Sequence, residues 1–155
     1  MLRTFAFFAA LLLLLLSCEE DRLETSTFYD NPTLNSIAGT WKVVSYEDYK
    51  DNTVITKTTE NSMNGAEVII SFNDTGTPLQ FWGVNTTNQI SGTYEYSPAE
   101  RTIQIISLDS SEINQPEWGD RFSEAIHKVR SYKVNEQQLR LYYNNRENSI
   151  TLVRQ

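Results

Sequence analysis

The sequence predicts a mostly β (α+β) fold: a curled antiparallel sheet or a partly open β-barrel of about eight strands, with one amphipathic helix near residues 115–130. Three observations predict it. Short runs of alternating apolar and polar residues follow one another from Ile37 onward. Turn-forming residues separate these runs at the spacing of β-hairpins. One late segment instead repeats its apolar residues with the period of a helix.

Eight runs are predicted to be strands. In the first, Trp41, Val43 and Ser45 alternate with Val44 and Tyr46, which fits a half-buried strand. The runs are residues 40–49, 66–72, 78–84, 89–96, 101–108, 131–134, 138–143 and 149–154, with turns at 73–76, 97–98, 135–136 and 144–145. Hairpins in this order favour an antiparallel meander that curls or closes.

The helical pattern covers residues 114–130. Asn114 is expected to cap the helix, with Pro116 tolerated in its first turn. Gly119 weakens the pattern, so a start at Asp120 is the alternative. The helix should lie over the sheet or plug one end of a barrel. Its apolar stripe consists of Trp118, Phe122, Ala125, Ile126 and Val129.

The N-terminus has the layout of a targeting segment. One cation, Arg3, precedes an apolar run over residues 5–16, and small Ser17 follows. The run is shorter than the ~20 residues that a membrane-spanning helix needs, so it indicates the apolar core of a signal peptide. Residues 1–17 are therefore predicted to be a signal peptide.

Residues 15–18, Leu-Leu-Ser-Cys, resemble the lipobox of bacterial lipoproteins. The resemblance implies that Cys18 carries diacylglycerol, becomes the mature N-terminus and is then acylated, so that labelled palmitate would be incorporated. Two or three acyl chains anchor a protein stably, because one alone is marginal. The alternative is a secreted protein with an incidental thiol, although a lone cysteine is unusual in an oxidising compartment. The expected localisation is the outer membrane, lipid-anchored, on the periplasmic side or the cell surface.

Residues 18–36 are predicted to form a flexible acidic tether after the lipidated cysteine, because they are polar and lack periodicity. The acids Glu19, Glu20 and Asp21 resemble a surface-display signal of some Gram-negative lipoproteins, or they begin an ordinary solvated linker. A single domain over residues 37–155 follows, since the chain is too short for two comfortable cores.

Composition argues against several classes of function. The formal net charge is −7, which disfavours nucleic acid, whose phosphates need a basic surface. No Cys/His pair or loop-spaced acids indicate a metal, and no glycine-rich cradle indicates a phosphate cofactor. The only histidine, His127, lies beside the helical stripe, as on a solvated face. We expect no catalytic residue, no cofactor, no metal and no enzymatic activity.

Five motifs of the domain, followed by a final apolar strand, resemble the META domain of HslJ-like lipoproteins: "IAGTW" at 37–41, "TNQISGTYEY" at 87–96, "IQIISLDSSEI" at 103–113, "EAIHKVRSYKV" at 124–134 and "LRLYY" at 139–143. In their order and spacing they span essentially the whole domain, residues 37–155. The resemblance implies a partly open antiparallel barrel with a packed helix, envelope association and links to envelope stress, without settled catalytic residues. The matching positions are Gly39 and Trp41, then Asn88, Gly92 and Tyr94, then Ala125, Ile126, Val129 and Tyr132.

The chain departs from that family at two positions. Many members carry cysteines where this chain has Thr87 and Gln115, so no disulfide is available here. A second resemblance competes, because Gly39-Thr40-Trp41 is also how lipocalin-like domains begin, with the tryptophan closing the barrel floor. A lipocalin-like carrier of a small apolar ligand should enclose a cavity of roughly a few hundred Å³, whereas a META-like binder should have a filled interior.

Aromatic residues make up 12% of the chain and are the remaining signal for binding. Core packing explains most of them. Trp82 is the candidate for a ligand or partner contact, because it alternates out of phase with Leu79 and Phe81. We expect a lipid-anchored envelope protein with a non-enzymatic binding domain, attached to the membrane through Cys18 and contacting an unknown envelope protein or a small apolar ligand.

Overall fold

The computed structural model of the protein describes residues 36–111 and 113–155. The predicted signal peptide, the lipidation site Cys18 and almost all of the tether lie outside these residues. Among the described residues, no helix combines the length and apolar character needed to cross a bilayer.

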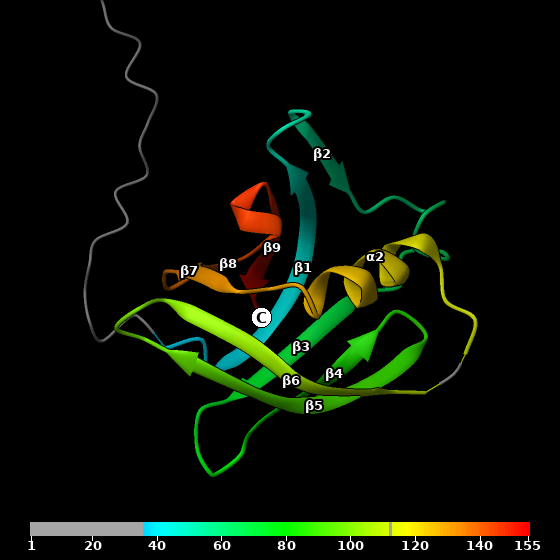
Figure 1. The fold of residues 1–155 in the computed structure, drawn as a ribbon. Coiled ribbons are helices and arrows are strands. Elements are labelled where there is room, and N and C mark those ends of the chain that lie inside the picture. Colours follow the sequence, from blue (N-terminus) through cyan, green and yellow to red (C-terminus); the bar gives the residue numbers. More distant parts are fainter. Residues whose placement is uncertain (1–35, 112) are drawn as a thin grey trace, which may run out of the picture.

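The described chain is a closed antiparallel barrel with one helix and one extra strand (Figure 1). The elements are β1 (Gly39–Asp48), β2 (Thr53–Thr56), β3 (Val68–Asn73), β4 (Leu79–Asn85), β5 (Asn88–Ser97), β6 (Thr102–Ser110), α2 (Glu117–Ile126), β7 (Ser131–Val134), β8 (Gln138–Tyr143), a 3-10 turn (Asn144–Arg146) and β9 (Asn148–Arg154). From β3 to β9 each strand pairs with the next along the chain, β1 pairs with both β2 and β3, and the barrel closes where β1 pairs with β9.

The predicted fold class is confirmed: every predicted strand run corresponds to a strand, and they form one antiparallel meander. The barrel is closed rather than partly open, since β1 pairs with β9 over residues Trp41 to Asp48. The strand β2 was not predicted. It extends the edge of β1 beyond β3, and its residues are mostly exposed, so no alternation distinguishes it from a loop.

Strand β1 contains a bulge that sequence alternation does not reveal. Its register against β9 shifts between Val43 and Ser45, so the residues after the bulge change faces. Tyr46, expected opposite Trp41 and Val43, instead points inside, where its ring meets Trp118 edge-on at 4.7 Å between centroids. The predicted alternation is therefore wrong beyond Val43.

The helix is shorter than its pattern and begins at neither predicted position. It runs from Glu117 to Ile126, and Pro116 occupies the N-cap position without a side-chain hydrogen bond. Asn114 does not cap it. The Trp118 backbone N–H is satisfied by the carbonyl of Asn61 at 2.8 Å, so a neighbouring loop replaces the local cap.

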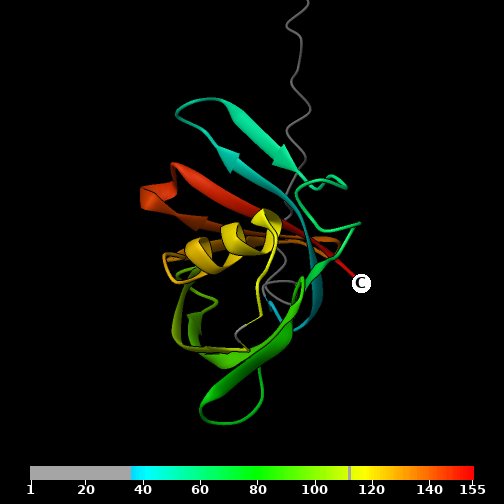
Figure 2. The same ribbon diagram turned by 90° about the vertical axis from the view of Figure 1, so that its right-hand side faces the viewer.

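The apolar stripe of the helix is buried as predicted, including Val129, which lies just beyond the helix end. Figures 1 and 2 show α2 between the β7–β9 part of the sheet and the β3–β4 part. It belongs to the connection from β6 to β7, two strands that pair only through Thr102 and Ser131. Because β6 and β7 share so short a ladder, the buried side chains of α2 provide much of the apolar packing at this part of the barrel.

Candidate functional site: an outer groove at Trp82

The interior of the described barrel is filled by side chains. All eight barrel strands and the helix contribute to one hydrophobic cluster, in which Trp41, Trp118 and Phe122 are fully buried. Trp41 has two specific contacts: its indole N–H donates to the Ile37 carbonyl at 2.8 Å, and the Arg154 guanidinium lies 4.1 Å from its ring centroid. Large buried side chains of this kind occupy the centre of the barrel.

The central Asn88, Gly92 and Tyr94 positions have structural roles. The Asn88 amide donates to the carbonyl of Ile113 at 2.9 Å and accepts from its N–H at 2.8 Å. Gly92 lies opposite Phe81, whose ring fills the space of a side chain. The buried Tyr94 hydroxyl donates to the Asn73 carbonyl at 3.1 Å, and burial raises its pKa well above the usual value. These residues hold the barrel together rather than form a reactive site.

The β4–β5 turn is attached to the segment before the helix by polar side chains. Thr87 Oγ1 donates to the Asn114 carbonyl at 3.2 Å, and the Gln115 amide oxygen accepts from Asn88 at 3.0 Å. Asn85 donates to the Gly119 carbonyl at 2.9 Å. Hydrogen bonds thus connect the β4–β5 turn to the segment that precedes α2.

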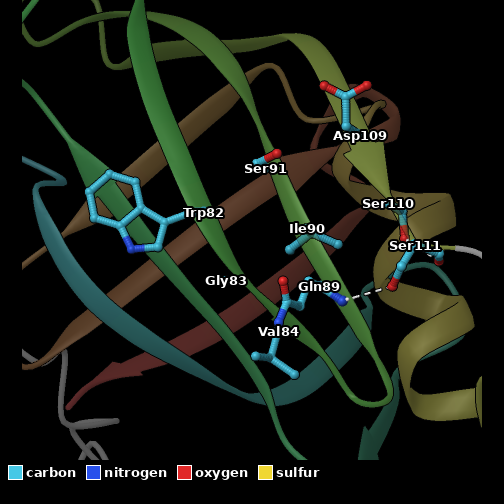
Figure 3. Close-up of a pocket in the computed structure, with 9 residues that line it drawn as sticks. All are labelled: Trp82, Gly83, Val84, Gln89, Ile90, Ser91, Asp109, Ser110 and Ser111. Atoms are coloured by element: carbon cyan, nitrogen blue, oxygen red, sulfur yellow. Dashed lines mark hydrogen bonds between the residues drawn. The ribbon is translucent and has the colours of Figure 1, made fainter.

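Trp82 lies on the outer face of β4, as its alternation predicted. Its side chain is 51% exposed, whereas neighbouring Phe81 is buried. It lines a groove of about 570 Å³ across β4, β5 and β6 (Figure 3). The lining consists of Trp82, Gly83, Val84, Gln89, Ile90, Ser91, Asp109, Ser110 and Ser111.

The groove follows from strand register and side-chain size. Trp82 pairs with Ser91, and Ser91 pairs with Asp109, so these three residues form one cross-strand row. Figure 3 shows the small Ser91 side chain between the indole and the carboxylate. Two strand spacings separate the outer members, a span of about 10 Å. Because the Ser91 side chain is smaller than those of Trp82 and Asp109 on either side, the row forms a trough that is open to solvent.

The next row continues the groove toward the barrel end. Val84 pairs with Gln89, and the backbone N–H of Gln89 donates to the Ser111 hydroxyl at 3.1 Å. Val84 is half-exposed, so the trough has an apolar wall along β4 and polar groups along β5 and β6. Such a mixed surface can recognise a ligand that has both apolar and polar faces.

Sequence reasoning identified Trp82 but missed Gln89, Ser91 and Asp109. Alternation in residues 89–96 could place Gln89 and Ser91 on one face, but not beside Trp82. Asp109 lay beyond the predicted end of its strand, and β6 in fact continues to Ser110. The pairing of β5 with β6 includes a register shift between Thr93 and Tyr94. This shift cannot be predicted from the alternation of residues in either strand.

A second polar cluster on the outer face of β1, β8 and β9 is internally satisfied. One Glu47 carboxylate oxygen accepts from Thr151 at 2.8 Å, and the other from Tyr49 at 2.8 Å. Arg140 lies 3.7 Å from the same carboxylate. Burial raises the Glu47 pKa, but the hydrogen bonds from Thr151 and Tyr49 and the charge of Arg140 outweigh it, so the pKa lies below its usual value.

Glu47 should make stability depend on acid pH. Because its folded pKa is depressed, its contribution is present above the unfolded pKa of about 4.3 and is lost as pH falls through the folded pKa. Glu47→Gln should therefore unfold at lower urea than the wild type at pH 7, with a difference that shrinks below about pH 4.3. The control Glu100→Gln, at an exposed turn, should change stability by less than about 0.5 kcal/mol. A Glu47→Gln difference that is constant with pH would contradict this.

Within the part of the chain that the structure describes, no group of three or more His, Cys, Asp or Glu side chains is placed to hold a metal. His127 is exposed at the C-terminal end of α2, on the solvated side expected from its position. The groove at Trp82 is the candidate site.

The fold and this site define a small antiparallel β-barrel with a filled interior and an external groove. The chain belongs to the DUF4847 family, a domain of unknown function, whose model matches residues 31–153. No curated protein matches the chain.

The solved structures that are similar to this chain include the following two. The NMR structure of a protein from Burkholderia xenovorans has a TM-score of 0.63 and 16% identity, covering 81% of this chain and 88% of that one. The crystal structure of a DUF4847 family protein from Bacteroides vulgatus ATCC 8482 has a TM-score of 0.53 and 19% identity, covering 75% of this chain and 92% of that one. At these identities the likeness concerns the fold.

Proposed function

We propose that this protein is a lipid-anchored, non-enzymatic binding protein of the bacterial envelope, and that its binding surface is the groove at Trp82. The observation that carries the proposal is a half-exposed tryptophan in a trough on three strands, outside a barrel whose interior is full. A large exposed aromatic side chain is a common anchor of binding surfaces. Among the described residues, His127 is exposed and the Glu47 carboxylate is held in structural hydrogen bonds, which favours recognition over catalysis at these two groups.

The proposal includes a relationship to the META domain at the level of architecture. It is supported by the central motif, since Asn88 fastens a loop and Gly92 admits the Phe81 ring. It is also supported by the hydrogen bond from Thr87 to Asn114, beside Gln115. The proposed cellular role is protein contact or shielding during envelope stress.

The anchor is tested at Cys18. Cys18→Ser is expected to abolish incorporation of labelled palmitate and to release the protein from the membrane fraction, because lipid attachment needs the thiol. Metabolic labelling and fractionation of cells measure both. Trp82→Ala is the control and should keep label and membrane association. Palmitate label on Cys18→Ser would exclude lipidation at this residue.

The groove is tested by photo-cross-linking in intact cells. A photoreactive amino acid at position 91, in the centre of the trough, should give a discrete adduct that Trp82→Ala removes. The control is the same amino acid at position 54, where Val54 is exposed on β2, away from the groove. Identical adducts at both positions, or none at position 91, would contradict the proposal. Native mass spectrometry with a co-purified apolar molecule that Trp82→Ala leaves in place would favour a lipocalin-like carrier instead.

A further inference from the structure

Some polar side chains of the groove have no hydrogen-bond partner within the described chain, whereas the Ser110 and Ser111 hydroxyl groups donate to the Ser111 carbonyl and to Asn88. The side chains of Gln89, Ser91 and Asp109 make no hydrogen bond to any other described residue, although Ser111 and the Gln89 backbone are engaged. The Glu47 cluster, on the same outer surface, has both carboxylate oxygens occupied by hydroxyl groups. Asp109 therefore differs from the structural carboxylate in having all its acceptor capacity available.

The remaining wall of the groove is aromatic. The indole of Trp82 is half-exposed, and no described residue accepts from its N–H. Its face carries the negative part of the ring quadrupole, which attracts C–H groups and cations. A ligand that fills the trough must therefore place weakly polarised C–H groups on one side and hydrogen-bond donors, about 10 Å across the row, on the other.

Three ligand classes fit this arrangement poorly. Anions would meet the Asp109 carboxylate on a chain whose formal net charge is −7. Wholly apolar surfaces, such as the interior of a bilayer, would bury that carboxylate without a partner, which is costly. Extended peptides could add a main-chain ladder only at the edge of β6 that faces away from β5, because β4 and β5 are already paired on their two sides. A peptide at that edge would lie beside the trough and not across Trp82 and Ser91.

We propose that the groove binds a neutral oligosaccharide. This inference rests on the proposed binding function of the groove and specifies its ligand class. A pyranose ring has a C–H face that stacks on Trp82 and equatorial hydroxyl groups that donate to Asp109, and the Ser91 and Gln89 side chains can both donate and accept. The trough is open to solvent, so it accommodates part of a chain rather than an enclosed single sugar.

The test uses the full-length lipidated protein in a detergent without a sugar headgroup. Maltohexaose, cellohexaose and chitohexaose are each titrated, and saturation-transfer NMR detects contact between the protein and sugar ring protons. At least one oligosaccharide should bind saturably, with the strongest transfer to protons of one ring face. Trp82→Ala should raise its Kd by about tenfold or more, and Asp109→Asn by a smaller factor. Val54→Ala should leave the Kd unchanged.

The outcomes separate the ligand class from the groove. No saturable binding of any of the three sugars, or binding that Trp82→Ala leaves unchanged, overturns the saccharide proposal. If position 91 still cross-links in cells while the sugars do not bind, the groove stands and its ligand is another class. Trp82-dependent binding to phosphatidylethanolamine vesicles without sugar binding would assign the groove to a lipid surface and also overturns the proposal. Circular dichroism of each variant verifies that the barrel is folded.

Discussion

Trp118→Ala should be among the most destabilising single substitutions in the described barrel, lowering the free energy of unfolding by about 4 kcal/mol. Trp118 is completely buried on α2, edge-on to the Tyr46 ring, and its removal leaves a cavity between the helix and β1. The Tyr46 hydroxyl donates to the Trp118 carbonyl at 2.9 Å, so a shift of the helix also strains this hydrogen bond. Equilibrium urea unfolding measures the effect, with the slope m compared between variants.

Trp82→Ala is the matched control, since it makes the same chemical change on the outer face. Its expected effect on stability is within about 0.5 kcal/mol, because half of the side chain is already in water. Trp118→Phe should cost less than Trp118→Ala, since it retains most of the apolar volume and removes a buried indole N–H that has no hydrogen-bond partner. Equal losses for Trp118→Ala and Trp82→Ala would contradict the helix as a packed part of the core.

Gly92→Ala should also destabilise the barrel strongly, by about 3 kcal/mol. A Cβ at this position would lie 2.0 Å from the Ser107 carbonyl oxygen and 2.6 Å from the Phe81 ring. The first contact is with backbone of the paired strand β6, so relief requires the sheet to move. The second requires the buried Phe81 ring to leave its place. Urea unfolding again provides the measurement.

Gly65→Ala is the control that distinguishes the cost of steric overlap from the cost of an unfavourable backbone conformation. Gly65 has a φ of +90°, which L residues rarely adopt, but a Cβ there meets nothing within 4 Å. Its cost is therefore conformational and should be about 1 kcal/mol. Gly92 has no such backbone constraint, so its larger cost arises from contact alone. A Gly92→Ala loss no greater than that of Gly65→Ala would mean that β5 and β6 adjust freely at this pair.

Sequence patterns predicted the fold class for clear physical reasons. Alternation identifies half-buried strands, and the turns between them are short, so consecutive strands must pair antiparallel. The helical stripe from Trp118 to Val129 was equally readable, because burial of one face imposes the 3.6-residue period. The start of the helix was not predictable in the same way, because the carbonyl of Asn61, in a distant loop, accepts the hydrogen bond that a local cap would otherwise accept.

The candidate site was likewise predictable only in part. Alternation placed Trp82 on the face opposite Phe81, but the residues beside it depend on how strands align. Asp109 reaches the Trp82 row only through the register of β5 and β6, which includes a shift that local sequence does not encode. The predicted lipid site at Cys18 remains a prediction from the N-terminal pattern, since it lies outside the described residues.

Local periodicity was sufficient to predict eight of the nine strands in their order, the helix with its buried stripe, and the outward direction of Trp82. Closure of the barrel through β1 and β9, its filled interior, and the trough that joins Trp82 to Asp109 became apparent only in the folded structure. These three properties depend on cross-strand register and on the volumes of side chains far apart in the chain, and no local pattern contains them.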